Sequence, residues 1–235
     1  MIALSCECCM DLMARQPDRH FDLAIVDPPY GIGQDWKRRK SICSKKLSFP
    51  STSYKNDKIP PAKYFSELSR VSKERIVFGY NYFTEHLGPT NYLIVWDKLS
   101  SSNDSFLYSK AEIAYTSIHI PLQIIRVPWD GCRTGKETGD RKIHPHQKPV
   151  ELYVKVLQKY AKPGWHILDT HMGSGSSVIA CHKLGLDMTA CEIDPCYFKE
   201  AKKRIEREAS NLELFPSELR QFRQKFLFED IKEAQ

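Results

Sequence analysis

An Asp-Pro-Pro-Tyr motif, formed by Asp27, Pro28, Pro29 and Tyr30, directly follows the apolar stretch 21–26. Two consecutive prolines cannot continue a β-ladder, so the chain must leave the sheet here with fixed φ angles and with backbone carbonyls that lack a local donor. An aromatic ring beside free acceptors can hold a flat base. The motif therefore suits methylation of an exocyclic amine. An ordinary strand exit with a buried tyrosine could also contain this run, so a second motif is needed to decide.

A glycine-rich turn follows another apolar strand much later in the chain. Residues 166–169 predict a strand that ends at Asp169, and residues 176–184 predict a helix. Between them, Gly173 and Gly175 allow a ligand to approach the backbone closely, and the start of the helix offers unpaired N–H groups. This order of strand, glycine turn and helix is typical of a nucleotide-binding site.

The next predicted strand, 187–192, ends in Glu192, at the spacing of roughly 20 residues that separates the glycine turn of nucleotide-binding βαβ units from an acid that accepts hydrogen bonds from ribose. The third glycine of the dinucleotide fingerprint is absent, because Ser177 and Val178 begin the helix. This absence disfavours a pyrophosphate and an NAD-type dehydrogenase. S-adenosylmethionine fits better, since carboxylates and aromatic faces can stabilise its cationic sulfonium without a phosphate cradle.

Together these motifs resemble those of the beta-class amino methyltransferases of DNA, the N6-adenine and N4-cytosine enzymes. The resemblance covers most of the chain and includes segments 75–83, 92–98 and 111–116. The run His-Pro-His-Gln-Lys-Pro at 144–149 is similar to a family signature, His-Pro-x-Gln-Lys-Pro. As in that family, the catalytic half precedes the cofactor half. The resemblance implies a site-specific DNA methyltransferase, typical of restriction-modification, that acts on the N6 amino group of a flipped adenine.

The resemblance also implies roles for single residues. In the catalytic set Asp27, Pro28, Pro29 and Tyr30, the Asp27 carboxylate and the Pro28 carbonyl would accept the amine hydrogens, and Tyr30 would stack on the flipped base. Asp169 and Lys148 are similar to the family residues that handle the amino and carboxyl ends of the methionine moiety. The implied cofactor-binding set is Cys8, Lys148, Asp169, His171, Gly173, Ser174, Gly175, Glu192 and Asp194.

The chain departs from the family pattern in two places. Thr170 and His171 replace the usual Pro and Phe of the glycine turn, and His171 could take the place of Phe as a flat ring. Cys8 stands where many relatives carry an aspartate that bonds to the adenine of the cofactor. A thiol is a weak acceptor, so adenine recognition would depend on backbone groups instead.

Several other activities remain as alternatives. N4-cytosine methylation is the nearest, because the amine has a similar geometry, but in the family it goes more often with Ser-Pro-Pro-Tyr. C5-cytosine methylation needs a cysteine nucleophile in a Pro-Cys turn. Pro195 and Cys196 form such a dipeptide, but they open a helix after Glu192, far in sequence from the target motif. Planar amines of RNA or protein are further substrates, and a catalytically silent DNA-binding module is the alternative outside enzymes.

Charge and its clustering favour double-stranded DNA as the partner. The net charge is +6 and the pI is near 8.8, which attracts a polyanion. The predicted insertion 31–59 mixes Lys and Arg with aromatic residues and could contact phosphates or close over an extruded base, although a solvated surface loop explains it equally well. The interval 118–147 is our candidate for target recognition. A homodimer and a cognate restriction endonuclease would be additional partners.

The alternation of elements predicts an α/β fold of the Rossmann-like methyltransferase type, with a mostly parallel seven-stranded sheet and helices on both faces. A single domain would span 1–235, with a C-terminal helical extension at 211–235. We expect strands at 2–5, 22–27, 74–79, 91–96, 111–117, 166–169 and 187–192, and helices at 9–16, 60–71, 149–161, 176–184 and 195–208.

The cysteines and the hydropathy of the chain bear on its cellular compartment, on metal binding and on membrane insertion. Eight cysteines without a secretory leader indicate a reducing, cytoplasmic compartment rather than a disulfide framework. The cysteines at 6, 8 and 9 lack the paired Cys-x-x-Cys knuckles of zinc sites, so we expect no metal. No apolar stretch approaches the ~20 residues needed to span a bilayer.

Overall fold

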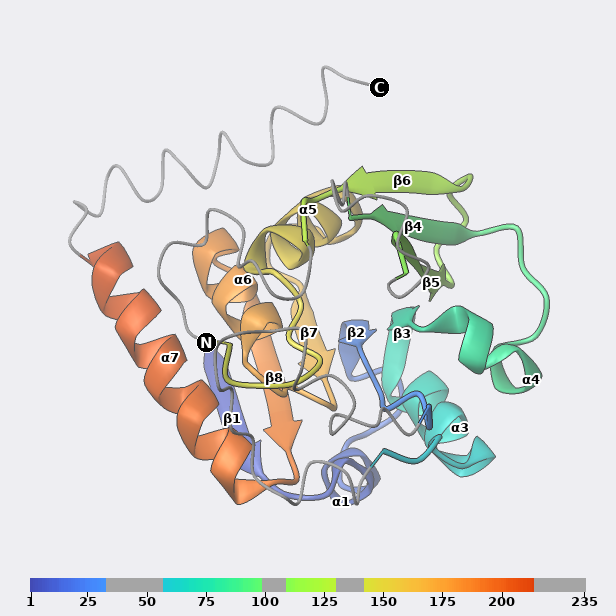
Figure 1. The fold of residues 1–235 in the computed structure, drawn as a ribbon. Helices are drawn as coiled ribbons and strands as arrows, with labels where there is room; N and C mark the ends of the chain where they lie inside the picture. Colours follow the sequence, from blue (N-terminus) through green and yellow to red (C-terminus); the bar gives the residue numbers. More distant parts are fainter. Residues whose placement is uncertain (33–56, 99–108, 130–141, 214–235) are drawn as a thin grey trace.

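The computed structural model describes residues 1–32, 57–98, 109–129 and 142–213. Eight strands form one sheet in the order β1-β8-β7-β2-β3-β5-β4-β6 (Figure 1). They are β1 (Ile2–Cys6), β2 (Phe21–Val26), β3 (Ser72–Phe78), β4 (Leu93–Asp97), β5 (Ala111–Thr116), β6 (Gln123–Arg126), β7 (His166–Asp169) and β8 (Asp187–Glu192). Only β5 runs antiparallel to its neighbours among the described strands, so the sheet is mostly parallel.

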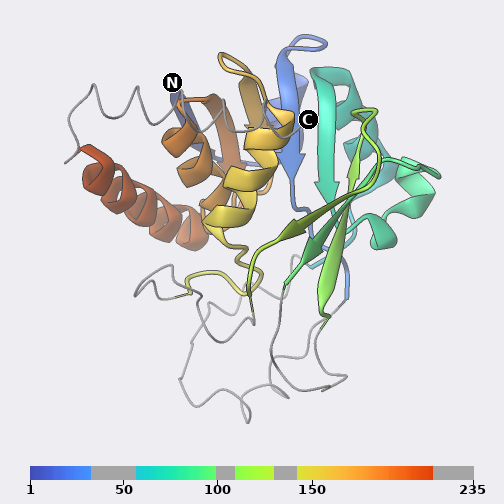
Figure 2. The same cartoon turned by 90° about the horizontal axis from the view of Figure 1, so that it is seen from above.

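Helices cover both faces of the sheet (Figures 1 and 2). On one face, α5 (Val150–Tyr160), α6 (Ser176–Leu184) and α7 (Pro195–Glu213) lie over the larger apolar core. On the other face, α1 (Cys9–Ala14) and α3 (Ala62–Val71) lie over a second core. The short helices η2 (Tyr80–Tyr82) and α4 (Thr84–Leu87) follow β3. The α/β class and the helices on both faces, predicted from sequence, are therefore confirmed.

Local sequence explains these elements. The β2 segment Phe-Asp-Leu-Ala-Ile-Val is apolar almost throughout because a central parallel strand is covered on both faces, and all of its residues except Asp22 are buried. In α3, the buried residues recur with helical spacing and form one stripe toward the sheet. They are Tyr64, Phe65, Leu68 and Val71.

The order of the strands determines where a ligand can bind. β7 and β2 are parallel neighbours near the middle of the sheet, with Ala24 opposite Leu168. From β7 the chain continues through α6 to β8 on one side, whereas β2 leads toward α3 and β3 on the other side. In open α/β sheets, ligands bind outside the carboxyl ends of the strands where the winding direction switches. The switch point here lies at the ends of β2 and β7.

The structure corrects the predicted strand number, because the described part of the chain already contributes eight strands to the sheet and not seven. The additional strand, β6, lies within the candidate target-recognition interval 118–147, where we expected no strand. Its four residues are too few to show an alternating pattern, and Pro121 and Pro128 flank it. Pairing with β4 stabilises β6 as a strand. The indole N–H of Trp96 on β4 also donates to the carbonyl of Val127, which follows β6, at 3.0 Å. Helix α4 was also not predicted.

Several predicted segments fall partly outside the described residues. These are 33–56 of the basic insertion, 130–141 of the target-recognition interval, and the C-terminal extension from 214 onward. Within the described ranges, no helix combines the length and apolar character required to cross a membrane. The same ranges contain no group of three or more His, Cys, Asp or Glu side chains arranged to hold a metal ion.

Candidate active site

The two sequence motifs meet at one edge of the sheet. Asp27 is the first residue after β2, and Asp169 is the last residue of β7. Because β2 and β7 are adjacent and parallel, with Leu23 opposite Ile167, the proline turn and the glycine turn leave the sheet side by side. The spatial proximity that the sequence motifs required is therefore present.

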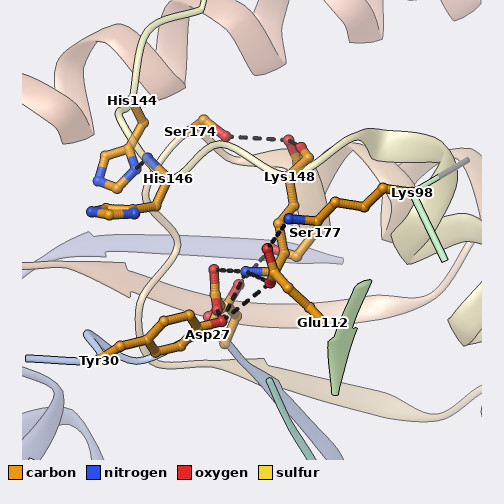
Figure 3. A network of polar contacts seen from close by, with 11 residues as sticks. Asp27, Tyr30, Lys98, Glu112, His144, His146, Lys148, Ser174 and Ser177 are labelled. Atoms are coloured by element: carbon orange, nitrogen blue, oxygen red, sulfur yellow. Dashed lines mark hydrogen bonds and ion pairs between the residues drawn. The ribbon is translucent and has the colours of Figure 1, made fainter. Parts of the chain in front are cut away.

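A buried polar cluster surrounds Asp27 (Figure 3). The Tyr30 hydroxyl donates to Asp27 Oδ1 at 2.6 Å, and the Lys148 ammonium donates to Asp27 Oδ2 at 2.5 Å. Lys148 is only 5% exposed, and its Nζ also lies 3.1 Å from the Tyr30 hydroxyl. Although burial disfavours a charged ammonium, the adjacent Asp27 and Glu112 carboxylates raise the pKa of Lys148. The lysine therefore remains protonated at neutral pH.

Glu112 and Lys98 complete this cluster, and sequence reasoning did not single out either of them. Glu112 Oε2 lies 3.1 Å from Lys148 Nζ, and Glu112 Oε1 lies 2.7 Å from Lys98 Nζ. Burial opposes ionisation of Glu112, but Lys148 and Lys98 outweigh it and lower the pKa of the carboxyl to about 2. The cluster thus contains two carboxylates and two ammonium groups.

The Tyr30 ring is positioned by its neighbours. It stacks on Tyr82 with ring centroids 4.8 Å apart and an interplanar angle of 15°, and Phe83 contacts it edge-on at 5.9 Å. Gly79, which follows β3, has φ +80, and a Cβ placed there would lie 2.8 Å from Cδ1 and Cζ of Tyr30 and closer still to Cε1. A glycine is needed at 79 both for its left-handed backbone and for the space that the tyrosine occupies.

Asp169 begins the glycine turn as a buried acid with neutral donors. Its Oδ1 accepts the His171 backbone N–H at 2.9 Å, and its Oδ2 accepts the Ser177 hydroxyl at 2.5 Å. Asp169 is 2% exposed, and this burial raises the pKa of its carboxyl to about 7. A cation bound beside it would favour the ionised form.

His171 lies within the same turn as a neutral aromatic ring. Burial lowers its pKa to about 4, its Nδ1 lies 2.9 Å from the Thr170 hydroxyl, and its ring packs edge-on against Tyr64 at 5.4 Å. The Tyr64 hydroxyl in turn lies 2.7 Å from the Thr170 hydroxyl. The Thr170 hydroxyl and the His171 ring thus both contact Tyr64 of α3.

Glu192 links the glycine turn to the start of α7. Its two carboxylate oxygens accept the backbone N–H groups of Gly173 and Asp194, each at 2.9 Å. Asp194 accepts the N–H groups of Cys196 and Tyr197 at 2.8 and 3.2 Å, and so caps α7. Both acids lie at the same edge of the sheet as the glycine turn, and both fix nearby backbone by accepting its N–H groups.

The two glycines of the turn have different surroundings. A Cβ on Gly173 would find its nearest neighbour, the His144 ring, at 3.5 Å, which is an ordinary contact. A Cβ on Gly175 would lie 2.8 Å from Ile205 Cδ1 on α7. Gly175 therefore permits close helix packing, whereas a Cβ on Gly173 would fit against the His144 ring without a clash.

The remaining predicted cofactor residues flank the glycine turn. The Ser174 carbonyl accepts from the Arg204 guanidinium at 3.0 Å. The Ser176 hydroxyl donates to the Lys148 carbonyl at 2.7 Å and ties the turn to the Lys148 segment. Cys8 precedes α1, close to the end of β8, because the neighbouring Glu7 N–H donates to the Glu192 carbonyl at 3.1 Å. All of the predicted site residues thus lie at this edge of the sheet. Lys148 was expected to contact the methionine moiety of the cofactor, but its ammonium contacts Asp27 in this structure.

Parts of the chain are similar in sequence to known DNA methyltransferases. A family model described as DNA methylase (N6/N4 methyltransferases) matches residues 96–203. The type II methyltransferase M.HpaI of Haemophilus parainfluenzae is 22% identical, over 87% of this chain and 74% of its own length.

Solved structures show the same fold. The crystal structure of the M1.HpyAVI–SAM complex matches with a TM-score of 0.56 and 17% identity, over 87% of this chain and 99% of that chain. The PvuII DNA methyltransferase, described as cytosine-N4-specific, matches with a TM-score of 0.54 and 11% identity, over 89% of this chain and 91% of that chain. The segment that matches the family model contains Lys148 and the glycine turn, and the chain is similar in sequence and in fold to DNA methyltransferases.

Proposed function

We propose that the protein transfers a methyl group from S-adenosylmethionine to the N6 amino group of an adenine turned out of double-stranded DNA. The observation that supports this most strongly is the shared edge of the sheet, where Asp27 and the glycine turn that starts at Asp169 emerge from adjacent parallel strands. A methyl donor at the turn and an amine at Asp27 would then be neighbours. Holding two reactants together in this way supplies much of the rate of such reactions.

In this proposal, the Asp-Pro-Pro-Tyr motif activates the amino group of the target base. The lone pair of an adenine amino group is delocalised into the ring, so the nitrogen becomes a better nucleophile when acceptors draw its hydrogens out of the ring plane. The Asp27 carboxylate and the Pro28 carbonyl are the proposed acceptors, at the end of β2. The stacked rings of Tyr30 and Tyr82 offer a surface for the base. Stacking there would offset part of the few kcal/mol that it costs to unstack the base from the duplex.

The residues of the glycine turn fit a cationic adenosine cofactor. Asp169 is a buried acid whose carboxyl has a pKa of about 7, and a positive group beside it would restore its charge. Glu192 retains lone pairs for ribose hydroxyls beyond the two backbone N–H groups that it accepts. When bound, S-adenosylmethionine supplies the electrophilic methyl group.

N4-cytosine methylation is the second candidate, and one observation favours it. The fold resembles that of the cytosine-N4-specific PvuII enzyme almost as well as that of M1.HpyAVI, with TM-scores of 0.54 and 0.56. Cytosine N4 presents the same amine geometry to an acceptor pair. The Asp in Asp27-Pro28-Pro29-Tyr30 favours adenine, because the cytosine enzymes of the family more often carry Ser.

A nucleoside analysis tests the proposal. Unmethylated DNA is incubated with the protein and methyl-labelled S-adenosylmethionine and digested, and the nucleosides are separated by mass spectrometry. Labelled N6-methyladenine is the expected product. N4-methylcytosine would select the second candidate, and cofactor binding without any methyl transfer would indicate a silent DNA-binding module.

A further inference from the structure

Both carboxylate oxygens of Asp27 are already engaged. Oδ1 accepts the Tyr30 hydroxyl at 2.6 Å, and Oδ2 accepts the Lys148 ammonium at 2.5 Å. A carboxylate in a tight ion pair is a weaker acceptor, because the neighbouring ammonium already draws on its negative charge. Each oxygen keeps a second lone pair, but Asp27 becomes a stronger acceptor for hydrogens of the target base when Lys148 withdraws from Oδ2.

Glu112 gives Lys148 a second carboxylate within reach. Its Oε2 lies 3.1 Å from Lys148 Nζ, so the ammonium contacts both acids at once. A small displacement toward Glu112 would release Asp27 without leaving Lys148 unpaired. This matters because Lys148 is only 5% exposed, and an uncompensated buried charge is strongly destabilising.

Lys98 fixes the position of Glu112, the second partner of Lys148, through an ion pair. Its ammonium lies 2.7 Å from Glu112 Oε1, on the side of the carboxylate away from Lys148, and Lys98 is 14% exposed. Lys98 follows β4 and Glu112 is the second residue of β5, and these strands pair with Trp96 opposite Glu112. The position of Glu112 is therefore fixed by the sheet as well as by its ion pair.

We propose that Glu112 is a positioning residue that takes over the Lys148 ammonium when the target amine reaches Asp27. This inference rests on the proposed amino methyltransferase function. In the resting state Lys148 is shared between Asp27 and Glu112. During transfer it pairs with Glu112 alone, so that Asp27 recovers its capacity to accept hydrogens.

A double-mutant cycle tests this exchange. Glu112→Gln keeps the shape of the side chain but removes its charge, so Lys148 would stay on Asp27. We expect the single-turnover rate of methyl transfer, at saturating DNA and cofactor, to fall roughly 10- to 100-fold, while the Kd for S-adenosylmethionine is unchanged. In a Lys148→Met background, where no ammonium blocks Asp27, the same substitution should change the rate by less than about 2-fold.

The matched control is Glu200→Gln on α7, which neutralises an exposed acid paired with Lys203 at 2.8 Å. Its rate should equal that of the wild type. If Lys148→Met is inactive by itself, Lys98→Met serves instead. Because Lys98 acts through Glu112, the Lys98→Met/Glu112→Gln double variant should be no slower than Glu112→Gln alone.

Three results would overturn the inference. The first is an unchanged rate in Glu112→Gln, and the second is a loss of equal size in the Lys148→Met background. The third, in the substitute cycle, is additive losses from Lys98→Met and Glu112→Gln. A wild-type protein that binds S-adenosylmethionine but methylates no DNA would overturn the proposed function and this inference with it, whereas normal wild-type activity with any of the three results removes the inference alone.

Discussion

The Lys148 ammonium lies 2.5 Å from Oδ2 of Asp27, although the two residues are 121 positions apart in the chain. This contact joins the His-Pro-His-Gln-Lys-Pro segment to the Asp-Pro-Pro-Tyr motif. The Lys148 carbonyl also accepts from Ser176 at the start of α6, so the same residue touches the glycine turn. Lys148 therefore connects the catalytic and cofactor halves of the site.

Replacing Asp27 tests the proposed acceptor. In Asp27→Ala the amine loses its carboxylate partner, and we expect methyl transfer to fall by at least roughly 100-fold, the lower limit typical of a lost acid-base group. Binding of S-adenosylmethionine should remain nearly intact, because Lys148 keeps Glu112 as a partner at 3.1 Å. Labelled methyl incorporation and titration calorimetry measure the two effects. Retained turnover in the variant would refute the role of Asp27.

Gly79→Ala tests the placement of Tyr30. The new Cβ would overlap the Tyr30 ring, with atoms 2.8 Å away or closer, so the ring must move and methyl transfer should fall at least roughly 100-fold, the loss that a misplaced active-site group can cause. Gly164→Ala is the matched control, because Gly164 has a φ of +79, close to that of Gly79, but nothing lies within 4 Å of the added Cβ. Both variants carry the backbone strain of about 1–2 kcal/mol. Equal activities of the two would show that the Tyr30 contact is unimportant.

Alanine substitutions at Gly173 and Gly175 should differ in their effects on protein stability and on cofactor binding. Gly175→Ala places a Cβ 2.8 Å from Ile205 and should lower the melting temperature through the contact with α7. Both variants carry the strain of a positive φ, but in Gly173→Ala the nearest atom is 3.5 Å away, so the melting temperature should fall less and the further loss should appear as weaker cofactor binding. Thermal unfolding and calorimetric titration distinguish the two. If Gly173→Ala bound S-adenosylmethionine as the wild type does, close approach at this glycine would be ruled out.

Cofactor affinity should depend on pH through Asp169. Burial raises the pKa of this carboxyl to about 7, above its ordinary value, so it is largely protonated at pH 6 and largely ionised at pH 8. A cation binds better beside the ionised form, and the Kd for S-adenosylmethionine should therefore rise roughly 10-fold between pH 8 and pH 6. Calorimetry across this range measures it. In Asp169→Asn the contribution of this carboxyl should vanish, and an unchanged pH profile in that variant would contradict the assignment.

Much of the fold and the meeting of the two motifs could be predicted from sequence. Two apolar strands, one followed directly by Asp27 and one ending at Asp169, must present those residues at the same edge when they lie in a parallel sheet. The strand pattern and the glycine spacing sufficed for this. The eighth strand could not be predicted, because β6 is only four residues long and is stabilised by its pairing with β4.

Glu112 and Lys98 could not have been identified from motifs. β5 runs antiparallel to β3 and β4, so it is the start of β5, not its end, that reaches the catalytic edge. An acid at the start of a strand carries no signal of function in the sequence. Gly79 is a similar case: its need for space depends on where Tyr30 lies, which only the tertiary structure reveals.

The central claim is that the cofactor and the target base share one cleft between the ends of β2 and β7. A crystal structure with a nonreactive amine analogue of S-adenosylmethionine tests it most directly. We predict that the adenosine contacts Glu192 and the 169–175 turn, and that the amine which replaces the methyl-bearing sulfonium faces Asp27 and Tyr30. An analogue bound elsewhere, or with that amine pointing away from Asp27, would contradict the account.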